Sequence, residues 1–385
     1  MIDFGITPHE FRARYLEQRP RLVKAALHTV PFAWADLDAV LHRIDPAPPA
    51  FELFKRGLLA VDEYSDRVIE LGVPRRRINK RRFFEHLRNG ATLVMNRFED
   101  HAAAAMRLCG EVGRYAGWPT TSNAYLSVGG RGTFGRHWDT HDVFALQLLG
   151  RKTWHVYPPT FPLPLPVHRS DFSGEPCPPT AELQCTLEPG DLLYVPRGWW
   201  HEAVPLAEPS LHLSIGAYAP TVNDYLMWAC ARHLPAVHGA RRAFTDAATP
   251  SELDGVLEEL RRVVLDPARR AEFCRETATR ERRVTEFDTE LYLGEGAQDR
   301  WRDVTVRLNL AEPPAPEQAE IVVKGAQLRL HALSRSIVAT VAAAPLPIDA
   351  LCERLPNERP DAIRAAVLDL AQHEIVAIER SAVAR

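Results

Sequence analysis

The feature that most constrains this chain is a β-rich stretch from Ser122 to Ala219. Short apolar runs are separated there by glycine and proline turn signals, a pattern typical of a small antiparallel barrel. In the run 210–216, alternation places His212 and Ser214 on one face and leucine and isoleucine side chains on the other. We therefore expect a barrel of short strands over this stretch, with the rest of the chain arranged around it.

Two histidines and an aspartate inside this stretch form a candidate metal site. His137 and Asp139 are two residues apart, a spacing that directs both side chains to one face of a strand while Trp138 points away. His201 follows far enough along the chain to come from a neighbouring strand. Two histidines and one carboxylate suit a redox-active iron that keeps open positions, although zinc and manganese also accept such ligands. The alternative is a barrel without metal, in which the three side chains are satisfied core groups.

A lysine in the same stretch indicates what else the barrel binds. Lys152 follows the turn at Gly150 and falls in the next expected strand. A lone cation that points into a small barrel is costly unless an anion pairs with it. A dicarboxylate cosubstrate would supply that anion; the alternative is a plain surface lysine.

Taken together, these motifs resemble those of the JmjC-type cupin oxygenases, which use Fe(II) and 2-oxoglutarate, and within them those of the ribosomal oxygenase subgroup. Residues from about 86 to 220 carry the specific motifs. The segments that match the subgroup are Asn123–Ser127, Gly132–Asp139, Asp142–Phe144, Leu146–Leu148 and Gly150–Trp154. The resemblance implies an α+β protein built on a double-stranded β-helix barrel with N-terminal helices.

The resemblance also implies roles for individual residues. It makes His137, Asp139 and His201 the iron ligands and Lys152 the partner of the distal carboxylate of 2-oxoglutarate, with O2 as the third reactant. It makes three further residues candidates for the rest of the cosubstrate pocket: Asn123, Tyr125 and Ser214. Some bacterial members carry arginine where this chain has Lys152, so their substrate is not carried over to it.

Other polar residues near the motif are assigned to the substrate side. His141 is two residues beyond Asp139 and shares its face on an extended strand, so we expect it beside the ligands rather than among them. We expect Arg136 and His212 on the substrate side as well. His212 and His155 are interpreted as hydrogen-bonded pocket or core histidines.

The length of the chain predicts more than one domain. At 385 residues it exceeds what one hydrophobic core usually accommodates. We divide it into a catalytic domain over 1–220, a helical region over 221–310 and a C-terminal domain over 311–385, with a proline-rich linker at 311–316. By resemblance, the helical region is a dimerisation module that makes the protein a homodimer, and the last domain is winged-helix-like.

Local signals place further elements before and after the barrel. Thr7, Pro8 and Glu10 predict a capped helix start. Further helices are expected from Asp36, over 83–88, over 100–115, from Thr249, and over 333–344, 348–355 and 361–372; strands are expected over 91–96 and 375–378. Residues 63–71 fit either a strand or a short helix. The proline-rich interruption at 156–180 predicts a long loop at the barrel mouth that shapes substrate access.

Amino-acid composition limits which binding partners and which cellular compartment are expected. The net charge of −3 argues against chain-wide nucleic-acid binding. The basic run 75–82 is interpreted as a solvated face, and a ribosomal or RNA contact is the alternative. The expected helix over 361–370 lacks a cationic face. The six cysteines form no C-x-x-C pair, which indicates reduced thiols. With no long apolar run and no signal-peptide pattern, we expect a cytoplasmic protein without membrane contact.

The sequence therefore predicts an Fe(II)- and 2-oxoglutarate-dependent dioxygenase that hydroxylates an amino-acid side chain. The resemblance points to an arginine or histidine residue of a protein such as a ribosomal protein. Two alternatives stay open: a hydroxylase of a peptide or amino acid in a biosynthetic pathway, and a non-catalytic cupin scaffold. The sequence does not distinguish hydroxylation from demethylation, nor does it give the regiochemistry.

Overall fold

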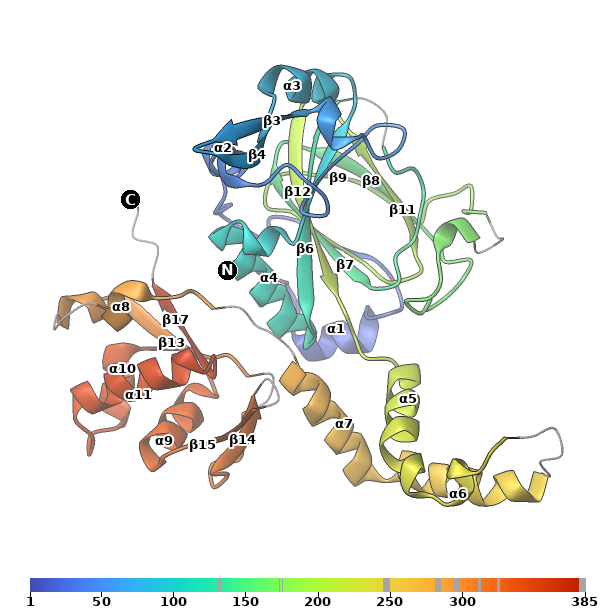
Figure 1. Cartoon of the computed structure of the whole chain (residues 1–385). Helices are drawn as coiled ribbons and strands as arrows, with labels where there is room; N and C mark the ends of the chain where they lie inside the picture. The colour runs from blue at the N-terminus through green and yellow to red at the C-terminus, as the bar shows by residue number, and fades with distance from the viewer. Residues whose placement is uncertain are drawn as a thin grey trace. The chain divides into compact units, whose positions relative to one another are not determined.

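A computed structural model of the chain describes residues 1–129, 133–172, 174, 176–244, 250–280, 285–293, 298–310, 313–323 and 326–380. It divides into two compact units, Met1–Ala219 and Pro220–Arg385 (Figure 1). The expected helix start at Thr249 and the first two residues of the expected linker at 311–316 lie outside the described residues.

The first unit contains the expected barrel, formed by two antiparallel sheets. In the larger sheet the strand order is β1-β10-β7-β12-β6-β5-β2, and in the smaller it is β11-β8-β9. The larger sheet comprises β1 (Arg21–Val23), β10 (Leu192–Val195), β7 (Asp142–Leu149), β12 (Pro209–Ala217), β6 (Thr120–Val128), β5 (Thr92–Asn96) and β2 (Phe51–Phe54). The smaller comprises β11 (Trp200–Pro205), β8 (Lys152–Tyr157) and β9 (Leu183–Leu187).

The strand β7 is buried on both faces, which explains its nearly continuous apolar sequence. Val143 and Ala145 pack into a cluster with Trp154 and Val156 of the smaller sheet. The intervening residues, such as Phe144, belong to the main core, together with side chains from the helices outside the sheet. The two alternating sets of β7 residues therefore belong to different cores, an inner one between the sheets and an outer one beneath the helices.

The face of β12 and β6 that belongs to the main core is apolar, while the other face is polar. Leu211, Leu213 and Ile215 pack in the main core, and the alternate positions His212 and Ser214 point the other way. The alternation expected from the sequence is therefore present, and it lines the barrel interior with hydrogen-bonding groups.

Helices cover the outer face of the larger sheet. They are α1 (Pro8–Arg14), α2 (Trp34–Arg43), α3 (Lys80–Arg88) and α4 (Ala103–Ala116). Figure 1 shows α4 lying along β6, and its buried residues include Leu108 and Val112. The cap expected at Thr7 is present as a capping box with Glu10.

The hairpin of β3 (Ser65–Glu70) and β4 (Val73–Ile78) settles two expectations. Residues 63–71, which fit either a strand or a helix, are mainly strand. The basic run 75–82 is divided between β4 and α3. The helix α3 begins at Lys80, three residues before the expected start at residue 83. Asn79 caps α3 by accepting a hydrogen bond from the Arg82 amide, and this cap places the helix start inside the basic run.

The turn that leads into Lys152 requires a glycine. Gly150 has φ +60°, and a Cβ atom there would lie 2.0 Å from the carbonyl oxygen of Pro209. The close approach of the β7–β8 turn to the start of β12 therefore excludes any side chain at this position. The turn fixes where β8 begins and hence where Lys152 enters the barrel.

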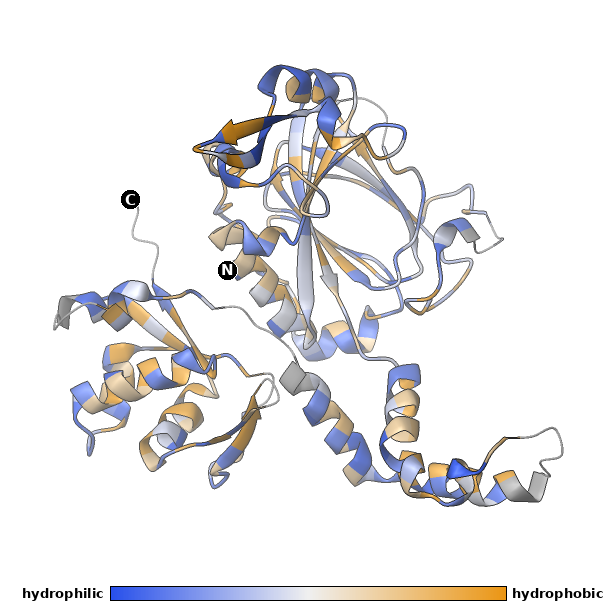
Figure 2. Ribbon diagram, in the orientation of Figure 1, coloured by the Kyte–Doolittle hydropathy of each residue, from blue (hydrophilic) through white to orange (hydrophobic). Residues whose placement is uncertain are grey.

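The second unit begins with helices and ends in a mixed α/β part. The helices are α5 (Val222–His233), α6 (Pro250–Leu265), α7 (Pro267–Arg280) and α8 (Thr289–Leu293). They are followed by β13 (Val304–Leu308), β14 (Glu320–Val323), β15 (Ala326–Arg329), α9 (Ala332–Val341), β16 (Leu346–Pro347), α10 (Ile348–Arg354), α11 (Pro360–Gln372) and β17 (Val376–Arg380). The three helices and the final strand expected after residue 333 are present. In Figure 2, apolar residues are frequent in α9–α11, whereas α7 is largely hydrophilic.

The boundary expected at residue 311 does not coincide with the C-terminal sheet. The strand β13 ends before that position, yet it pairs with both β16 and β17. Leu291 and Trp301 also pack in the same apolar cluster as α9–α11. The proline-rich segment is therefore a connection within the C-terminal part, and it is not a linker that precedes it.

All six cysteines are free thiols in the structure, as the sequence indicates. Among the described residues, no helix is both long enough and apolar enough to cross a membrane.

Asp142 gives the fold a pH-dependent stability. Its carboxylate accepts hydrogen bonds from the Tyr194 hydroxyl at 2.8 Å and the Arg197 amide at 3.2 Å, but burial raises its pKa to about 6. The folded protein then holds this proton more tightly than the unfolded chain, so stability falls as the pH rises from about 4 to about 6. Asp142→Asn should stabilise the protein by about 1–2 kcal/mol at pH 8 and have little effect at pH 4.

Thermal unfolding at the two pH values tests this expectation. Asp38→Asn, at an exposed position on α2, is the control and should change stability little at either pH. An Asp142→Asn protein that is no more stable than the wild type at pH 8 would contradict the assignment of a buried charge.

Candidate metal centre

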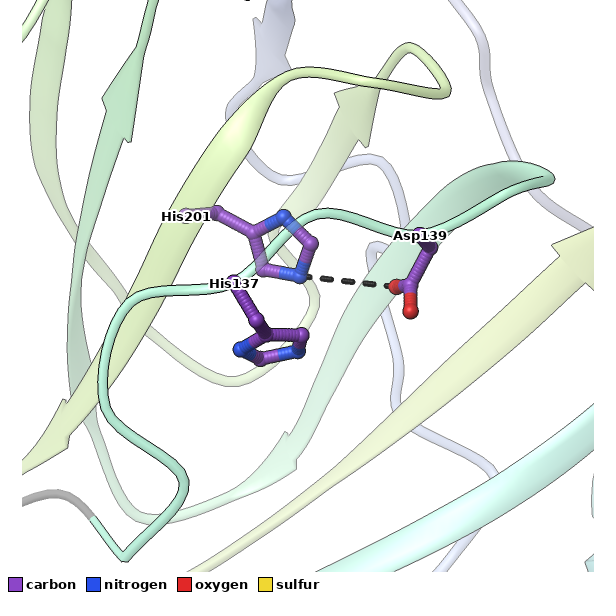
Figure 3. Close-up of side chains that lie close together, drawn as sticks. All are labelled: His137, Asp139 and His201. Carbon is purple, nitrogen blue, oxygen red and sulfur yellow. Dashed lines mark ion pairs between the residues drawn. The ribbon is translucent and has the colours of Figure 1, made fainter. Parts of the chain in front are cut away.

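The structure brings His137, Asp139 and His201 together (Figure 3). One potential ligand atom from each residue lies within 4.8 Å of the others, and the Nε2 atom of His201 is 3.5 Å from a carboxylate oxygen of Asp139. His201 comes from β11, as expected of a neighbouring strand. His137 differs from the expectation, because it forms an isolated bridge with His201 and is not part of a regular strand. The extended backbone still directs His137 and Asp139 toward the same point.

Hydrogen bonds to backbone carbonyls orient both histidine rings. The Nδ1 atom of His137 lies 3.2 Å from the Gly135 carbonyl oxygen, and that of His201 lies 3.0 Å from the Trp199 carbonyl oxygen. Each Nδ1–H therefore donates to a carbonyl two residues earlier, which leaves the Nε2 lone pair for a metal ion. The donor set is thus two imidazole nitrogens and one carboxylate oxygen on one side of an ion, which fits iron and other divalent transition metals.

The protonation states of these groups also suit ligation. Burial, together with the nearby His137, lowers the pKa of His201 to about 4. Burial alone would raise the pKa of Asp139, but His201, His137 and His141 together lower it below its usual value. At neutral pH the site therefore offers a neutral imidazole at His201 and an ionised carboxylate, the forms that bind a metal ion.

A partly enclosed cavity of about 110 Å³ lies on the inner side of the three residues, between the sheets. Lys152 lines it, with only 2% of its surface exposed, and burial lowers its pKa to about 7. Within the described part of the chain, Lys152 forms no ion pair with a carboxylate; its Nζ atom contacts the imidazole of His212 at 3.1 Å. A buried cation with no acidic partner favours an anionic ligand in this cavity.

A larger cleft of about 670 Å³ opens to solvent on the outer side. It shares Phe134, His137 and Asp139 with the inner cavity, so the candidate metal position separates two compartments. The loop between β8 and β9 contributes residues 168–171 to the cleft. This agrees with the expectation that the loop shapes access to the site.

The other expected pocket residues lie on neighbouring strands. Tyr125 and Ser214 line the inner cavity. Asn123 pairs with Ser214 across the two strands β6 and β12, but it is not a lining residue, and its side-chain oxygen accepts a hydrogen bond from the Arg97 amide. The structure therefore brings two of these three candidates to the cavity.

The residues expected on the substrate side divide between the two compartments. His141 and Arg136 line the outer cleft; the ring of His141 stacks on Tyr218, and Arg136 pairs with Glu202 at 3.1 Å and lies over the ring of Tyr157. His212 lines the inner cavity instead, beside Lys152, because it lies on the interior face of β12. The expectation that His212 faces the substrate is therefore not supported by its position.

Several residues at the site were not singled out from the sequence. Trp154 lies between His201 and His212, and Thr92 and Thr133 line the inner cavity with their hydroxyl oxygens 2.7 Å apart. The period-2 alternation from Lys152 to Trp154 could have identified the tryptophan. Thr92 and Thr133 lie far apart in the sequence and carry no comparable signal.

Comparison with known protein families identifies a domain at this site. Residues 94–225 match the family model described as the JmjC domain. The match includes the three candidate ligands, Lys152 and the strands β6, β7, β8 and β12.

Proteins similar in sequence include ribosomal oxygenases. The chain is 30% identical to ribosomal oxygenase 1 of Gallus gallus over 221 residues, which is 55% of this chain and 35% of the relative. It is 43% identical to ribosomal oxygenase 1 of Homo sapiens over 113 residues, 27% of this chain and 17% of the relative. A bifunctional lysine-specific demethylase and histidyl-hydroxylase NO66 of Drosophila persimilis is 30% identical over 41% of this chain and 23% of its own length. The chain thus spans about a third or less of these relatives.

A solved structure resembles nearly the whole chain. YcfD, a ribosomal oxygenase from Escherichia coli in complex with cobalt and 2-oxoglutarate, superimposes with a TM-score of 0.59 at 18% identity. The superposition covers 98% of this chain and 100% of that one. At this identity the likeness shows a shared fold, that of a JmjC cupin with mixed α and β content.

The arrangement predicts which histidines bind metal. His137→Ala should lower the affinity for Co(II) by about 100-fold or more, because it removes one of three protein ligands. His141→Ala is the matched control: its ring is near the site but stacks on Tyr218, so the affinity should change by no more than a few-fold.

Titration calorimetry with Co(II) measures both affinities without any turnover. If His137→Ala and His141→Ala lose the same amount of Co(II) affinity, the ligand set has been assigned incorrectly.

Proposed function

We propose that this chain, which carries a JmjC domain over residues 94–225, is an Fe(II)- and 2-oxoglutarate-dependent hydroxylase. The observation that supports this most strongly is the position of the His137–Asp139–His201 triad between two compartments. The inner compartment contains a buried cation suited to a dicarboxylate, and the outer one is open to a larger molecule. A non-catalytic scaffold leaves the burial of Lys152 unexplained.

The donor set fits Fe(II), and the inner cavity fits an oxo acid with a second carboxylate. In this assignment His137, Asp139 and His201 hold the metal, and Lys152 binds the far carboxylate by a charge-assisted hydrogen bond. When bound, iron and 2-oxoglutarate supply the oxidising chemistry: O2, 2-oxoglutarate and a substrate C–H group give succinate, CO2 and a C–OH group. The protein orients the reactants, and the apolar ring of Trp154 lines the inner cavity.

The outer cleft favours a side chain of a protein as the substrate. Its volume and its opening to solvent differ from the small closed pocket expected for a free amino acid. The curated relatives are described as ribosomal oxygenases, which supports a ribosomal protein as the substrate. The same likeness favours hydroxylation, although one relative's name includes demethylation as well.

Charges in the cleft favour histidine over arginine as the modified residue. Among the described lining residues, the carboxylates are Asp139, which is a candidate ligand, and Asp171, which pairs with Arg169 at 2.8 Å. Arg136 also lines the cleft. A substrate guanidinium group would lie near these cations and would have no unpaired carboxylate among the described lining residues to bind. A neutral imidazole does not need such a partner. The name of the NO66 relative includes histidyl-hydroxylase, which agrees with this choice.

The second unit is proposed to consist of two functional parts. We assign the helices from residue 221 to a dimerisation region and the part from α8 onward to a winged-helix-like domain, replacing the boundary at 311. Large apolar side chains on α5 and α6 are exposed, among them Met227 at 63% and Leu257 at 58%. A second copy of the chain would cover such a surface, since an exposed apolar patch of this kind is typical of an interface. A cytoplasmic location fits the six free cysteines.

Turnover assays test the proposed activity. Wild-type protein with Fe(II), 2-oxoglutarate and ascorbate should form succinate faster with ribosomal-protein peptides that contain histidine than with the same peptides carrying arginine at that position. Lys152→Ala should lower the rate by about 100-fold or more because the distal carboxylate loses its partner, while Lys55→Ala, at an exposed position, should not. Mass spectrometry should detect the gain of one oxygen atom on the histidine.

If metal-loaded wild-type protein forms no succinate, the hydroxylase proposal is wrong and the non-catalytic scaffold remains. Faster turnover with the arginine peptides would overturn the charge argument alone.

The dimer proposal has a separate test. Met227→Asp combined with Leu257→Asp should convert the dimer to a monomer, because each buried carboxylate would lack a partner. Val167→Asp, at an equally apolar exposed position outside the helical region, should leave the dimer intact. Light scattering after size-exclusion chromatography measures both, and a wild-type monomer would contradict the assignment.

A further inference from the structure

We propose that His212 is a positioning residue, which holds the ammonium group of Lys152 where the far carboxylate of a dicarboxylic 2-oxo acid binds. The inference rests on the proposed function and adds a residue to it whose role no family resemblance assigns. It follows from the position of the two side chains, from the hydrogen bond between them and from the way the protein fixes the imidazole ring.

The contact between the two residues spans the barrel interior. Lys152 is the first residue of β8 in the smaller sheet, and His212 lies in the middle of β12 in the larger one. The Nζ and Nδ1 atoms are 3.1 Å apart, and the two residues are only 2% and 3% exposed. The lysine side chain therefore reaches from one sheet to an acceptor on the other.

The chemistry of the two groups determines the direction of this hydrogen bond. When Lys152 is protonated, its ammonium group has three donors and no acceptor, so the Nδ1 atom of His212 accepts the hydrogen bond. The imidazole is then neutral and carries its hydrogen on Nε2; burial and the nearby ammonium group both lower the pKa of His212, which agrees with this form. One N–H of Lys152 is occupied, and the other two remain for a carboxylate in the inner cavity.

Two aromatic side chains hold the imidazole ring in place. Tyr125, directly opposite on β6, stacks on it with ring centroids 4.9 Å apart and planes 5° apart. Trp154 meets it edge-on at 5.2 Å. Because these contacts restrict rotation of the ring about both of its side-chain bonds, the Nδ1 acceptor has a fixed direction.

The pairing of β7 with β12 is irregular beside His212, and a buried glutamine supports it. The register between β12 and β7 shifts immediately before His212: Leu211 pairs with Leu149, but His212 pairs with Gln147. The amide group of Gln147 donates to the carbonyl oxygens of Leu149 and Leu211, at 2.9 and 3.3 Å. The extra residue, Leu148, lies on β7. The alternation of β12 is therefore unbroken, and His212 keeps its place opposite Tyr125 on the interior face.

The contact with His212 should strengthen ligand binding, because the Lys152 side chain is already held in place before the ligand binds. An unsupported lysine side chain must be immobilised when it binds an anion, which weakens binding through lost rotamer entropy. With Nζ already held by His212, this loss occurs on folding and not on binding. His212 should therefore strengthen the binding of dicarboxylic 2-oxo acids and have no effect on 2-oxo acids that lack the second carboxylate.

Binding measurements on Mn(II)-loaded protein without O2 test this role apart from turnover. His212→Phe keeps a stacking ring but removes the acceptor, and should weaken 2-oxoglutarate binding about 10- to 100-fold. His212→Asn is the matched variant, since its amide oxygen can occupy nearly the same place as Nδ1, and should stay within a few-fold of wild type. Binding of 2-oxobutyrate, which has no second carboxylate, should be the same in all three proteins.

A double-mutant cycle shows whether His212 acts through Lys152. In a Lys152→Met background, His212→Phe should change 2-oxoglutarate affinity by less than about twofold, because the group that it positions is gone. An equal loss in both backgrounds, or an equal loss of 2-oxobutyrate binding, would overturn the proposal. So would wild-type affinity for 2-oxoglutarate in His212→Phe.

A measurement on the wild-type protein does not depend on whether the variants fold. Nitrogen-15 NMR of the metal-free protein at a pH below the Lys152 pKa of about 7 should find His212 protonated on Nε2, and a proton on Nδ1 would overturn the proposal. If metal-loaded wild-type protein does not bind 2-oxoglutarate at all, the proposed function itself fails. If it binds and only the His212 variants behave differently from expectation, the function stands and the positioning role is wrong.

Discussion

The pairing of two short backbone segments brings the candidate metal site together. His137 and His201 exchange two hydrogen bonds, His137 N–H to His201 carbonyl at 3.1 Å and His201 N–H to His137 carbonyl at 2.7 Å. A third bond, from the Gly198 amide to the Asp139 carbonyl at 2.9 Å, continues the contact. Because these bonds join the segment after β6 to the start of β11, two ligands distant in sequence are placed side by side before any metal ion binds. The inner cavity and the outer cleft both take their position from this contact.

Much of the fold follows from local sequence patterns. The alternation in β12, the apolar run of β7, the cap at Thr7 and the helices of the C-terminal part all have clear signals, and the structure contains them. The helix boundaries near Asn79 and the position of β13 were harder to place. A strand such as β13 is defined by its pairing with β16 and β17, and no local pattern of four or five residues reveals partners that lie so much later in the chain.

In the site, too, local sequence patterns predict some features, while others depend on contacts between residues far apart in the sequence. The two-residue spacing of His137 and Asp139 indicates that they act together, and the turn at Gly150 indicates where Lys152 enters. The alternation in β12 predicts that His212 and Ser214 share a face, but it does not reveal that His212 contacts a lysine from the opposite sheet. The cluster of Arg136, Tyr157 and Glu202 at the cleft is likewise a product of strand pairing.

The arrangement of two compartments on either side of one metal position has a kinetic consequence. Phe134, His137 and Asp139 line both the inner cavity and the outer cleft, so a molecule that moves between the two compartments passes the candidate ligands. Under the proposed function, a polypeptide substrate seated in that cleft would obstruct this passage. If the small acid uses this passage, the proposed hydroxylase should bind the acid before the polypeptide and release the polypeptide before the product of the acid. An excess of polypeptide should then slow turnover.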